Sequence, residues 1–324
     1  VVSSANIDFV QRMRRMPYSG ETVCEPELGY SYVPGGKGAN SAVAFARMGA
    51  DCVFQCKLGR DSNAKRLISF YQREGIDTRY IKEDENSATG LASILVEDNG
   101  KNRIIVYPGA NMTMTADDIE DGFTCYPDAV YLQFEIPDEA AIEATRRANE
   151  EGIPVFIDAG PARLDFPLSR LGKIEIFSPN ESETRVFTGI APTSEENALR
   201  ASIKLSSMVD AKYIVIKLGD RGSFIYDKKE YYVIPSEKVD VVDTTAAGDV
   251  FTAVMTYVYL SNKNIISAVK YATCAAALSV TKAGASSSIP TRAEVIAYAK
   301  NKVAAENGTA DNADAVVKDE AEEK

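Results

Sequence analysis

The run Asp243-Thr244-Thr245-Ala246-Ala247-Gly248-Asp249 carries the clearest local sign of chemistry in this chain. It follows the strand-like residues 238–242 and opens a helical pattern, so free backbone N–H groups and the positive end of the helix dipole would form a site for an anion. A carboxylate in the first helical turn, Asp249, could accept the proton of an attacking hydroxyl. Taken alone, the run is equally typical of a helix that Asp243 caps and whose dipole Asp249 complements.

A second run, Gly35-Gly36-Lys37-Gly38-Ala39-Asn40, precedes a helical pattern over 41–48. Three glycines in four residues give a tight backbone that is open to a ligand, and Lys37 and Asn40 add donors suited to sugar hydroxyls. The spacing is neither that of a P-loop nor that of a dinucleotide-binding loop. Taken alone, the run is more often an ordinary turn before a helix.

Two further runs follow predicted strands. Asn180 and Glu183 are three residues apart at a helix start, on one face, where they could hold a hydrated magnesium ion. The same N-x-x-E spacing is more often a capping box. The run Lys217-Leu218-Gly219-Asp220-Arg221-Gly222 ends another strand, where ligands bind in α/β sheets, and we expect it to form a hairpin turn as well.

Two single carboxylates also end predicted strands. Asp8 follows the first strand, and Glu135 follows the strand predicted over 129–134. The carboxyl edge of an α/β sheet is where functional side chains gather, although most acids at strand ends are simply solvated.

Composition narrows the chemistry further. The 324 residues include no histidine, which excludes Ser-His-Asp and Cys-His catalysis and histidine-ligated zinc, so a general base must come from a carboxylate or, less often, Lys, Tyr or Cys. The net charge of −11 argues against nucleic acid as a partner. The five cysteines have no zinc-site or disulfide spacing, and no apolar run approaches a membrane span, so we expect a cytoplasmic protein with no membrane contact.

The elements that must position these residues alternate between strands and helices, which predicts a doubly wound, mostly parallel sheet in three layers. The predicted strands cover 53–57, 129–134, 153–158, 175–178 and 213–218. The predicted helices cover 62–74, 139–150, 181–188, 195–207, 247–260, 265–281 and 291–305.

Two stretches break the alternation. Residues 20–33 are strand-like, and residues 89–107 have the pattern of a hairpin around Asn99-Gly100, a pair that favours a type I′ turn. We expect them to form a small β-sheet lid. The expected division is then an α/β core of residues 1–9, 35–88 and 109–305, a lid of residues 10–34 and 89–108, and an acidic, disordered tail of residues 306–324.

Together these motifs resemble the PfkB or ribokinase family of carbohydrate kinases, from Asn6 to about residue 300. The two signatures are the runs at 35–40 and 243–249, and their order and separation are highly specific. Residues 133–135, 160–163 and 179–183 are similar to the ribokinase branch of that family.

The resemblance implies a role for each candidate residue. Asp249 would be the base, and Ala246, Ala247 and Gly248 would form the anion hole. The residues that would hold the sugar are Asn6, Asp8, Gly36, Lys37, Asn40 and Glu135, beside Asp249. The residues that would hold the nucleotide are Asn180, Lys217, Gly219, Gly222, Gly248 and Thr273. Glu183 would bind magnesium through water. A monovalent cation, usually potassium, would lie among Asp243, Thr245, Lys282, Gly284 and Ser288, partly through the backbone.

The resemblance also implies the reaction and the partners. ATP with Mg²⁺ and K⁺ would phosphorylate D-ribose to D-ribose 5-phosphate, in a homodimer formed through the lid. Fructokinase, 2-deoxyribose kinase and nucleoside kinase remain alternatives inside the family. Outside it, the alternatives are a sugar sensor that has lost catalysis and a dinucleotide-dependent oxidoreductase, against which the absence of GxGxxG counts.

Three residues depart from the family pattern. Lys217 stands where ribokinases often carry threonine, and Asp158 where they often carry asparagine. Thr273 stands where some relatives carry histidine. None of these changes removes a catalytic group, but Asp158 leaves the identity of the sugar open.

Overall fold

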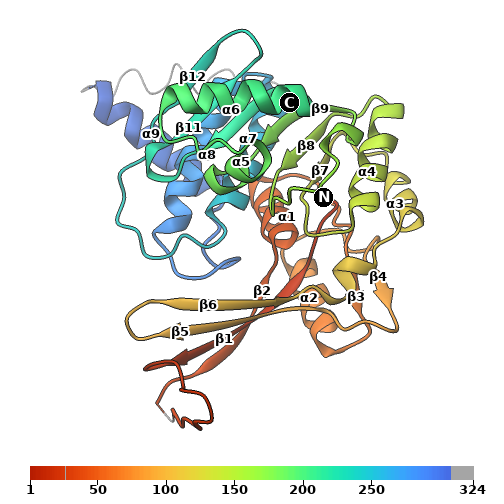
Figure 1. Ribbon diagram of the computed structural model, residues 1–324, viewed down its shortest axis with the longest axis vertical. Coiled ribbons are helices and arrows are strands. Elements are labelled where there is room, and N and C mark those ends of the chain that lie inside the picture. The colour runs from red at the N-terminus through yellow and green to blue at the C-terminus, as the bar shows by residue number, and fades with distance from the viewer. Residues whose placement is uncertain (26, 308–324) are drawn as a thin grey trace.

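A six-stranded sheet forms the centre of the molecule in the computed structural model, which describes residues 1–25 and 27–307 (Figure 1). Its strands lie in the order β12-β11-β10-β9-β8-β7, with β7 to β10 parallel and β11 and β12 antiparallel. Their bounds are β7 Val130–Leu132, β8 Val155–Asp158, β9 Lys173–Ser178, β10 Asp210–Lys217, β11 Ser223–Tyr226 and β12 Tyr231–Ile234. The tail predicted over 306–324 lies outside the described residues, apart from its first two.

Helices cover both faces of this sheet because both faces are apolar. Phe156, Ile176 and Val215 belong to one core, and the next residues along the same strands, Ile157 and Phe177, belong to the other. The helices on the first side are α1 Lys37–Met48, α2 Ser62–Arg73, α7 Ala247–Asn262, α8 Ile265–Val280 and α9 Arg292–Asn307. Those on the second side are α3 Ala116–Phe123, α4 Asp138–Glu150, α5 Glu181–Thr188 and α6 Glu195–Met208. The predicted three-layer α/β class is confirmed.

The start of the chain extends the sheet beyond β7. Val2 bridges both Leu132 and Gln55, and Val53 bridges Asp77. The strand predicted over 53–57 is therefore present mainly as single bridges. Two short strands, β3 Lys57–Gly59 and β4 Lys82–Asp84, pair beside it. Three 3₁₀ turns lie at η1 Gly109–Thr113, η2 Leu168–Arg170 and η3 Gly219–Arg221.

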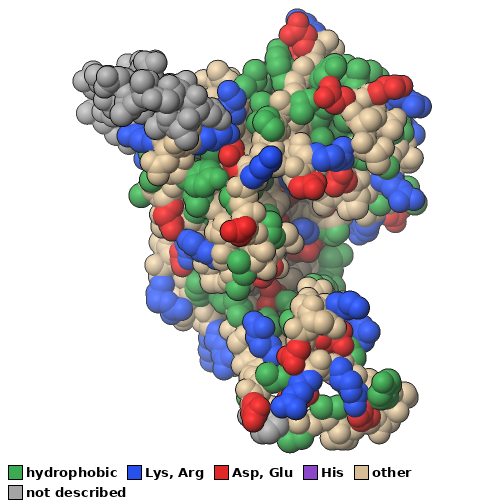
Figure 2. All heavy atoms as spheres, turned by 90° about the vertical axis from the view of Figure 1, so that its left-hand side faces the viewer, with side chains coloured by type: hydrophobic (Ala, Val, Ile, Leu, Met, Phe, Trp, Pro, Cys, Tyr) green, Lys and Arg blue, Asp and Glu red, His purple; other side chains and the backbone are tan. Residues whose placement is uncertain are grey.

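A separate four-stranded sheet, called the small sheet below, projects from the body (Figure 1). Its order is β2-β1-β5-β6, with bounds β1 Asn6–Met13, β2 Tyr30–Gly35, β5 Gly90–Glu97 and β6 Asn102–Tyr107. The predicted hairpin is the pair β5–β6, with Gly100 at φ 80° in its turn. The strand-like interpretation of residues 20–33 is wrong for the described residues before Tyr30, which are 20–25 and 27–29. Figure 2 shows a hollow between this sheet and the body, with acidic side chains visible inside it.

Two local predictions were wrong. Residues 238–242 form no strand in the described structure, because no neighbouring strand takes their backbone groups. Instead, the N–H of Val242 donates to the carbonyl of Val280, and Val241 and Val242 are each 62% exposed. The first helix begins at Lys37 rather than at residue 41, so the glycine-rich run forms its first turn.

Within the residues that the structure describes, no helix has both the length and the apolar character needed to cross a membrane.

Candidate active site

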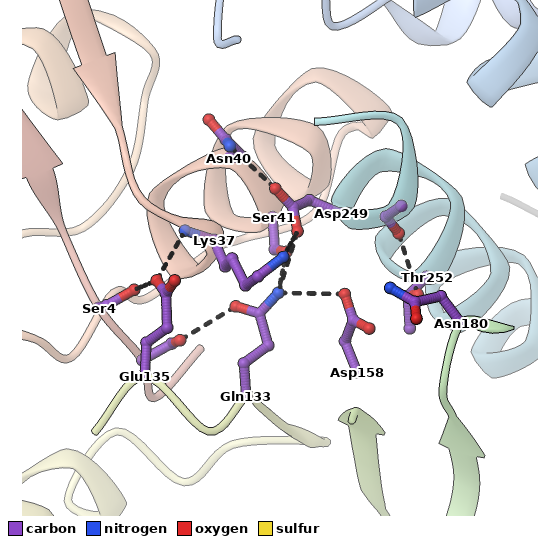
Figure 3. Close-up of polar contacts among 12 residues, drawn as sticks. Ser4, Lys37, Asn40, Ser41, Gln133, Glu135, Asp158, Asn180, Asp249 and Thr252 are labelled. Carbon is purple, nitrogen blue, oxygen red and sulfur yellow. Dashed lines mark hydrogen bonds and ion pairs between the residues drawn. The ribbon is translucent and has the colours of Figure 1, made fainter. Parts of the chain in front are cut away.

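Most of the residues singled out in the sequence come from elements that meet at the carboxyl edge of the sheet. The strands β7, β8 and β10 end there, the helices α1 and α7 begin there, and β1 leaves for the small sheet. Figure 3 shows side chains from these elements pointing toward one another. In α/β sheets this edge is where ligands bind.

Asp249 lies at the centre of this group, in the first turn of α7, and is only 4% exposed. Its Oδ2 accepts a hydrogen bond from Asn40 Nδ2 at 2.9 Å, and Oδ1 lies 3.8 Å from the Lys37 ammonium and 3.3 Å from Gln133 Nε2. Burial raises the pKa of Asp249 to about 6, while Lys37 acts in the opposite direction. A carboxylate with such a pKa is ionised at neutral pH and more basic than an ordinary aspartate, as a general base should be.

The N-terminus of α7 is suited to an anion. Ala246 adopts a left-handed conformation at φ 64°, and no side chain of the described residues caps this end of the helix. The N–H of Ala247 donates to the carbonyl of Thr244 at 3.3 Å, and the other first amides of the helix remain for another acceptor. The small residues at 246–248 leave the backbone accessible beside Asp249.

The sugar-side candidates lie where β1, β2 and α1 meet. Glu135 follows β7 in a loop and accepts hydrogen bonds from Ser4 Oγ and from the N–H of Lys37. Asp8 lies inside β1, not at a strand end, and its carboxylate occupies the space where a side chain on Gly35 would clash. Burial, followed by the charges of Glu135 and Asp249, raises the pKa of Asp8 to about 7.

Three other sugar-side residues have distinct settings. Asn40 is 5% exposed, and its Oδ1 is buried without a hydrogen-bond partner in the described structure, so it could accept from a hydroxyl. Asn6 Oδ1 is already engaged, because it accepts from Asn111 Nδ2 at 2.8 Å. Gly36 has φ 90°, and a Cβ there would lie 2.9 Å from the N of Asn6, so only glycine fits.

Asn180 and Glu183 form a capping box, which is the more common role of residues with this spacing. The Glu183 N–H donates to Asn180 Oδ1 at 2.9 Å, and the Asn180 N–H donates to Glu183 Oε2 at 2.7 Å. Burial raises the pKa of Glu183, against the attraction of Lys217. Its carboxylate packs against Gly160, where a side chain would clash with Oε1. A carboxylate held in this way can still accept from water on a magnesium ion.

Of the other nucleotide candidates, Gly219 and Gly222 form the predicted turn between β10 and β11, with φ 60° and φ 90°. Thr273 is buried on α8, and its hydroxyl donates to the carbonyl of Val269 at 2.8 Å. Lys217 ends β10 and points toward α7, where its ammonium donates to Thr252 Oγ1 at 3.2 Å.

Asp243 ties the start of α7 to the loop after α8. Its Oδ1 accepts from the N–H and hydroxyl of Thr245, and its Oδ2 accepts from the N–H of Gly284 at 2.9 Å. Ser288 is fully buried in the same loop. Oxygen donors of this kind suit a hard cation. The Lys282 side chain turns away to pair with Glu294 at 2.9 Å, so this residue could contribute only its backbone.

Comparisons with known proteins identify the family. The family profile described as pfkB family carbohydrate kinase matches residues 1–292. The chain belongs to the PfkB family of carbohydrate kinases.

Within the PfkB family, this chain is similar to ribokinases and to a deoxyribokinase. A bifunctional ribokinase/ribose-5-phosphate isomerase A from Fructilactobacillus sanfranciscensis is 37% identical over 91% of this chain, which spans 55% of that protein's length. A deoxyribokinase from Salmonella typhi is 31% identical, over 90% of this chain and 94% of the relative. The structure of Arabidopsis thaliana ribokinase complexed with ribose and ATP is similar with a TM-score of 0.84 and 32% identity, over 92% of this chain and 96% of that one.

Two residues that contact the candidate site, Gln133 and Asn111, were assigned no role from the sequence, although Gln133 lies in the run 133–135 that is similar to ribokinases. Gln133 Nε2 lies within hydrogen-bonding distance of both Asp249 and Asp158, and its Oε1 accepts from Ser3 Oγ. Asn111 also hydrogen-bonds the backbone of Ala5. Isolated polar residues inside apolar strands or loops follow no periodic pattern, so only the fold assigns them to the site.

Proposed function

We propose that this PfkB-family kinase is a ribokinase, which transfers the γ-phosphate of ATP to D-ribose and forms D-ribose 5-phosphate. The observation that carries the proposal is the position of Asp249. A buried carboxylate of raised pKa lies between the uncapped start of α7, suited to a phosphoryl group, and side-chain donors and acceptors suited to sugar hydroxyls. The Arabidopsis ribokinase with ribose and ATP supports ribose as the acceptor.

In this mechanism Asp8, Asn40 and Glu135 bind the sugar hydroxyls, together with Lys37. The Gly36 backbone and Asn6, which Asn111 holds in place, complete that side of the site. Asp249 takes the proton of the hydroxyl that attacks phosphorus. The amides of residues 246–248 stabilise the charge on the group in transfer. Water must be kept out, since it would otherwise accept the phosphate.

The nucleotide would lie along the strand ends next to α7, against Asn180, Lys217, Gly219, Gly222 and Thr273. Magnesium, when bound, would neutralise phosphate charge, and Glu183 would hold it through water. A potassium ion would lie behind the anion hole, among Asp243, Thr245 and the backbone of the loop from 282 to 288. Asp243 already joins these two segments.

The small sheet would act as the lid of a core made from the rest of the described chain, as expected, although its first strand begins at Asn6 rather than at residue 10. It would also be the contact surface of a homodimer. Its edge strand β6 exposes Ile104, Ile105, Val106 and Tyr107, each about half accessible. An apolar edge strand is a surface that a partner usually covers. Sedimentation analysis tests this proposal, since Val106→Glu should shift a dimer to monomers.

The direct test of the acceptor is ADP release from ATP, with Mg²⁺ and K⁺ present, across D-ribose, 2-deoxyribose, D-fructose and adenosine. Strong turnover with ribose alone supports the proposal. The deoxyribokinase relative makes 2-deoxyribose the second candidate. Preference for it, or for fructose or adenosine, would overturn ribose as acceptor while keeping the kinase chemistry.

A further inference from the structure

Lys217 and Asp158 form an ion pair beneath the start of α7. They end the strands β10 and β8, on either side of β9, and their side chains are only 12% and 3% exposed. The Lys217 ammonium donates to Asp158 Oδ1 and to Thr252 Oγ1. A lysine ammonium carries three N–H donors, so these contacts use two of them.

The ammonium also lies against the proposed anion hole. A Cβ built on Gly248 would be 3.7 Å from Lys217 Nζ, which places the charge beside the first turn of α7. We propose that the third N–H of Lys217 contacts the γ-phosphoryl group of ATP directly, so that Lys217 is a catalytic residue and Asp158 its positioning residue. This inference rests on the proposed function, since it assumes that the phosphoryl group lies at this helix start.

Asp158 has a second contact that fits a positioning role. Its Oδ2 accepts from Gln133 Nε2 at 3.2 Å, and the same nitrogen lies 3.3 Å from Asp249 Oδ1. Gln133 therefore links the carboxylates of Asp158 and Asp249 through one nitrogen, as Figure 3 shows. Asp158 holds the ammonium under the phosphoryl position, while Asp249 remains beside Lys37 and Asn40. The side-chain amide of Gln133 thus fixes Asp249, the proposed base, relative to the ammonium of Lys217.

The competing explanation is that the pair only balances two buried charges. A nucleotide comparison separates the explanations without any sugar. Binding of Mg-ADP and of a Mg-bound non-hydrolysable ATP analogue is measured by calorimetry for the wild type and for Lys217→Met. We expect the variant to weaken analogue binding about tenfold or more and ADP binding by less than about threefold. Equal losses for the two nucleotides, or no loss for either, would overturn the γ-phosphate contact.

Turnover of the double variant gives the second test. Lys217→Met alone leaves the charge of Asp158 buried without its ion-pair partner, so it should lower the unfolding midpoint. Lys217→Met/Asp158→Asn removes both charges and should restore the midpoint. We expect kcat to stay about 10- to 100-fold below wild type in both variants, with the KM for sugar within about threefold. Recovery of kcat in the double variant to within about threefold of wild type would show a structural pair only.

Lys212→Met is the matched control, since Lys212 pairs with Glu175 at the opposite end of β10 and should leave both nucleotide affinities and kcat unchanged. If the wild type phosphorylates no acceptor, the proposed function fails, and the two nucleotide affinities still decide whether Lys217 contacts the γ-phosphate.

Discussion

Asn40 and Asp249 are 209 residues apart in the chain, and the amide of one donates to the carboxylate of the other at 2.9 Å. Each belongs to the first turn or two of a helix, α1 for Asn40 and α7 for Asp249. The bond therefore joins the glycine-rich run to the proposed catalytic run. The other amide atom, the buried Oδ1 of Asn40, has no hydrogen-bond partner in the described structure and could accept from a sugar hydroxyl.

Asp249→Asn should abolish most of the turnover, because asparagine cannot take the proton of the acceptor hydroxyl. We expect kcat to fall by about 10³- to 10⁴-fold, with Mg-ADP affinity within about threefold of wild type. Steady-state assays and calorimetry measure the two quantities. Near-normal turnover in a variant with an unchanged unfolding midpoint would refute the assignment.

The pH dependence of kcat/KM should follow the carboxylates of the site. Asp249, with a pKa of about 6, must be ionised to act, so the rate should fall on the acid side of about pH 6 to 7. Lys37 is the largest influence that lowers this pKa, so Lys37→Met should move the acid limb to higher pH. A limb that stays in place in Lys37→Met would show that Asp249 does not produce it.

The carboxylate of Asp8, which is proposed to bind the sugar, should lower the stability of the folded protein at neutral pH. Its pKa rises from 3.8 in an ordinary setting to about 7 in the fold, so the folded state holds the proton more tightly. Stability from this group is full below about pH 4 and is lost as the pH rises toward 7, on the order of 4 kcal/mol. Asp8→Asn should thus raise the unfolding midpoint more at pH 8 than at pH 4, and it should raise the KM for sugar. Equal gains at both pH values would contradict the coupling.

Asp243→Ala should change the response to potassium. The substitution removes the oxygens that hold Thr245 and Gly284 together, so the proposed cation site loses both a ligand and its shape. We expect half-maximal activation to need about tenfold more KCl or greater. Asp240→Ala, an exposed carboxylate three residues earlier, is the control and should leave the KCl curve unchanged. A curve that is also unchanged in Asp243→Ala would exclude this location.

The parts of the fold that the sequence predicts well are those with a local signal. The hairpin β5–β6 follows from Asn99-Gly100, and α5 follows from its capping residue Asn180. The apolar residues near 238–242 predict a strand that the fold does not form, since a pattern of side chains does not reveal whether a neighbouring strand exists. The pattern places the start of the first helix too late because the glycines at 35, 36 and 38 are typical of a turn.

The candidate site was predictable as separate runs, but not as one arrangement. Lys217 and Asp158 each stood out as a departure from the family pattern, and nothing in the sequence indicated that they touch. Their contact depends on the strand order β10-β9-β8, which is a property of the sheet. Gln133 could not be assigned to the base for the same reason: its partners come from β8 and α7.

The continuity of β1 has a mechanical consequence. The strand begins at Asn6 beside the site and ends at Met13 in the small sheet, with Asp8 two residues from its start. If the small sheet moves as a cover, it carries part of the sugar's binding surface with it. Sugar binding and closure of the site would then be a single motion. A substitution that loosens the small sheet would therefore speed product release and weaken sugar binding through the same displacement.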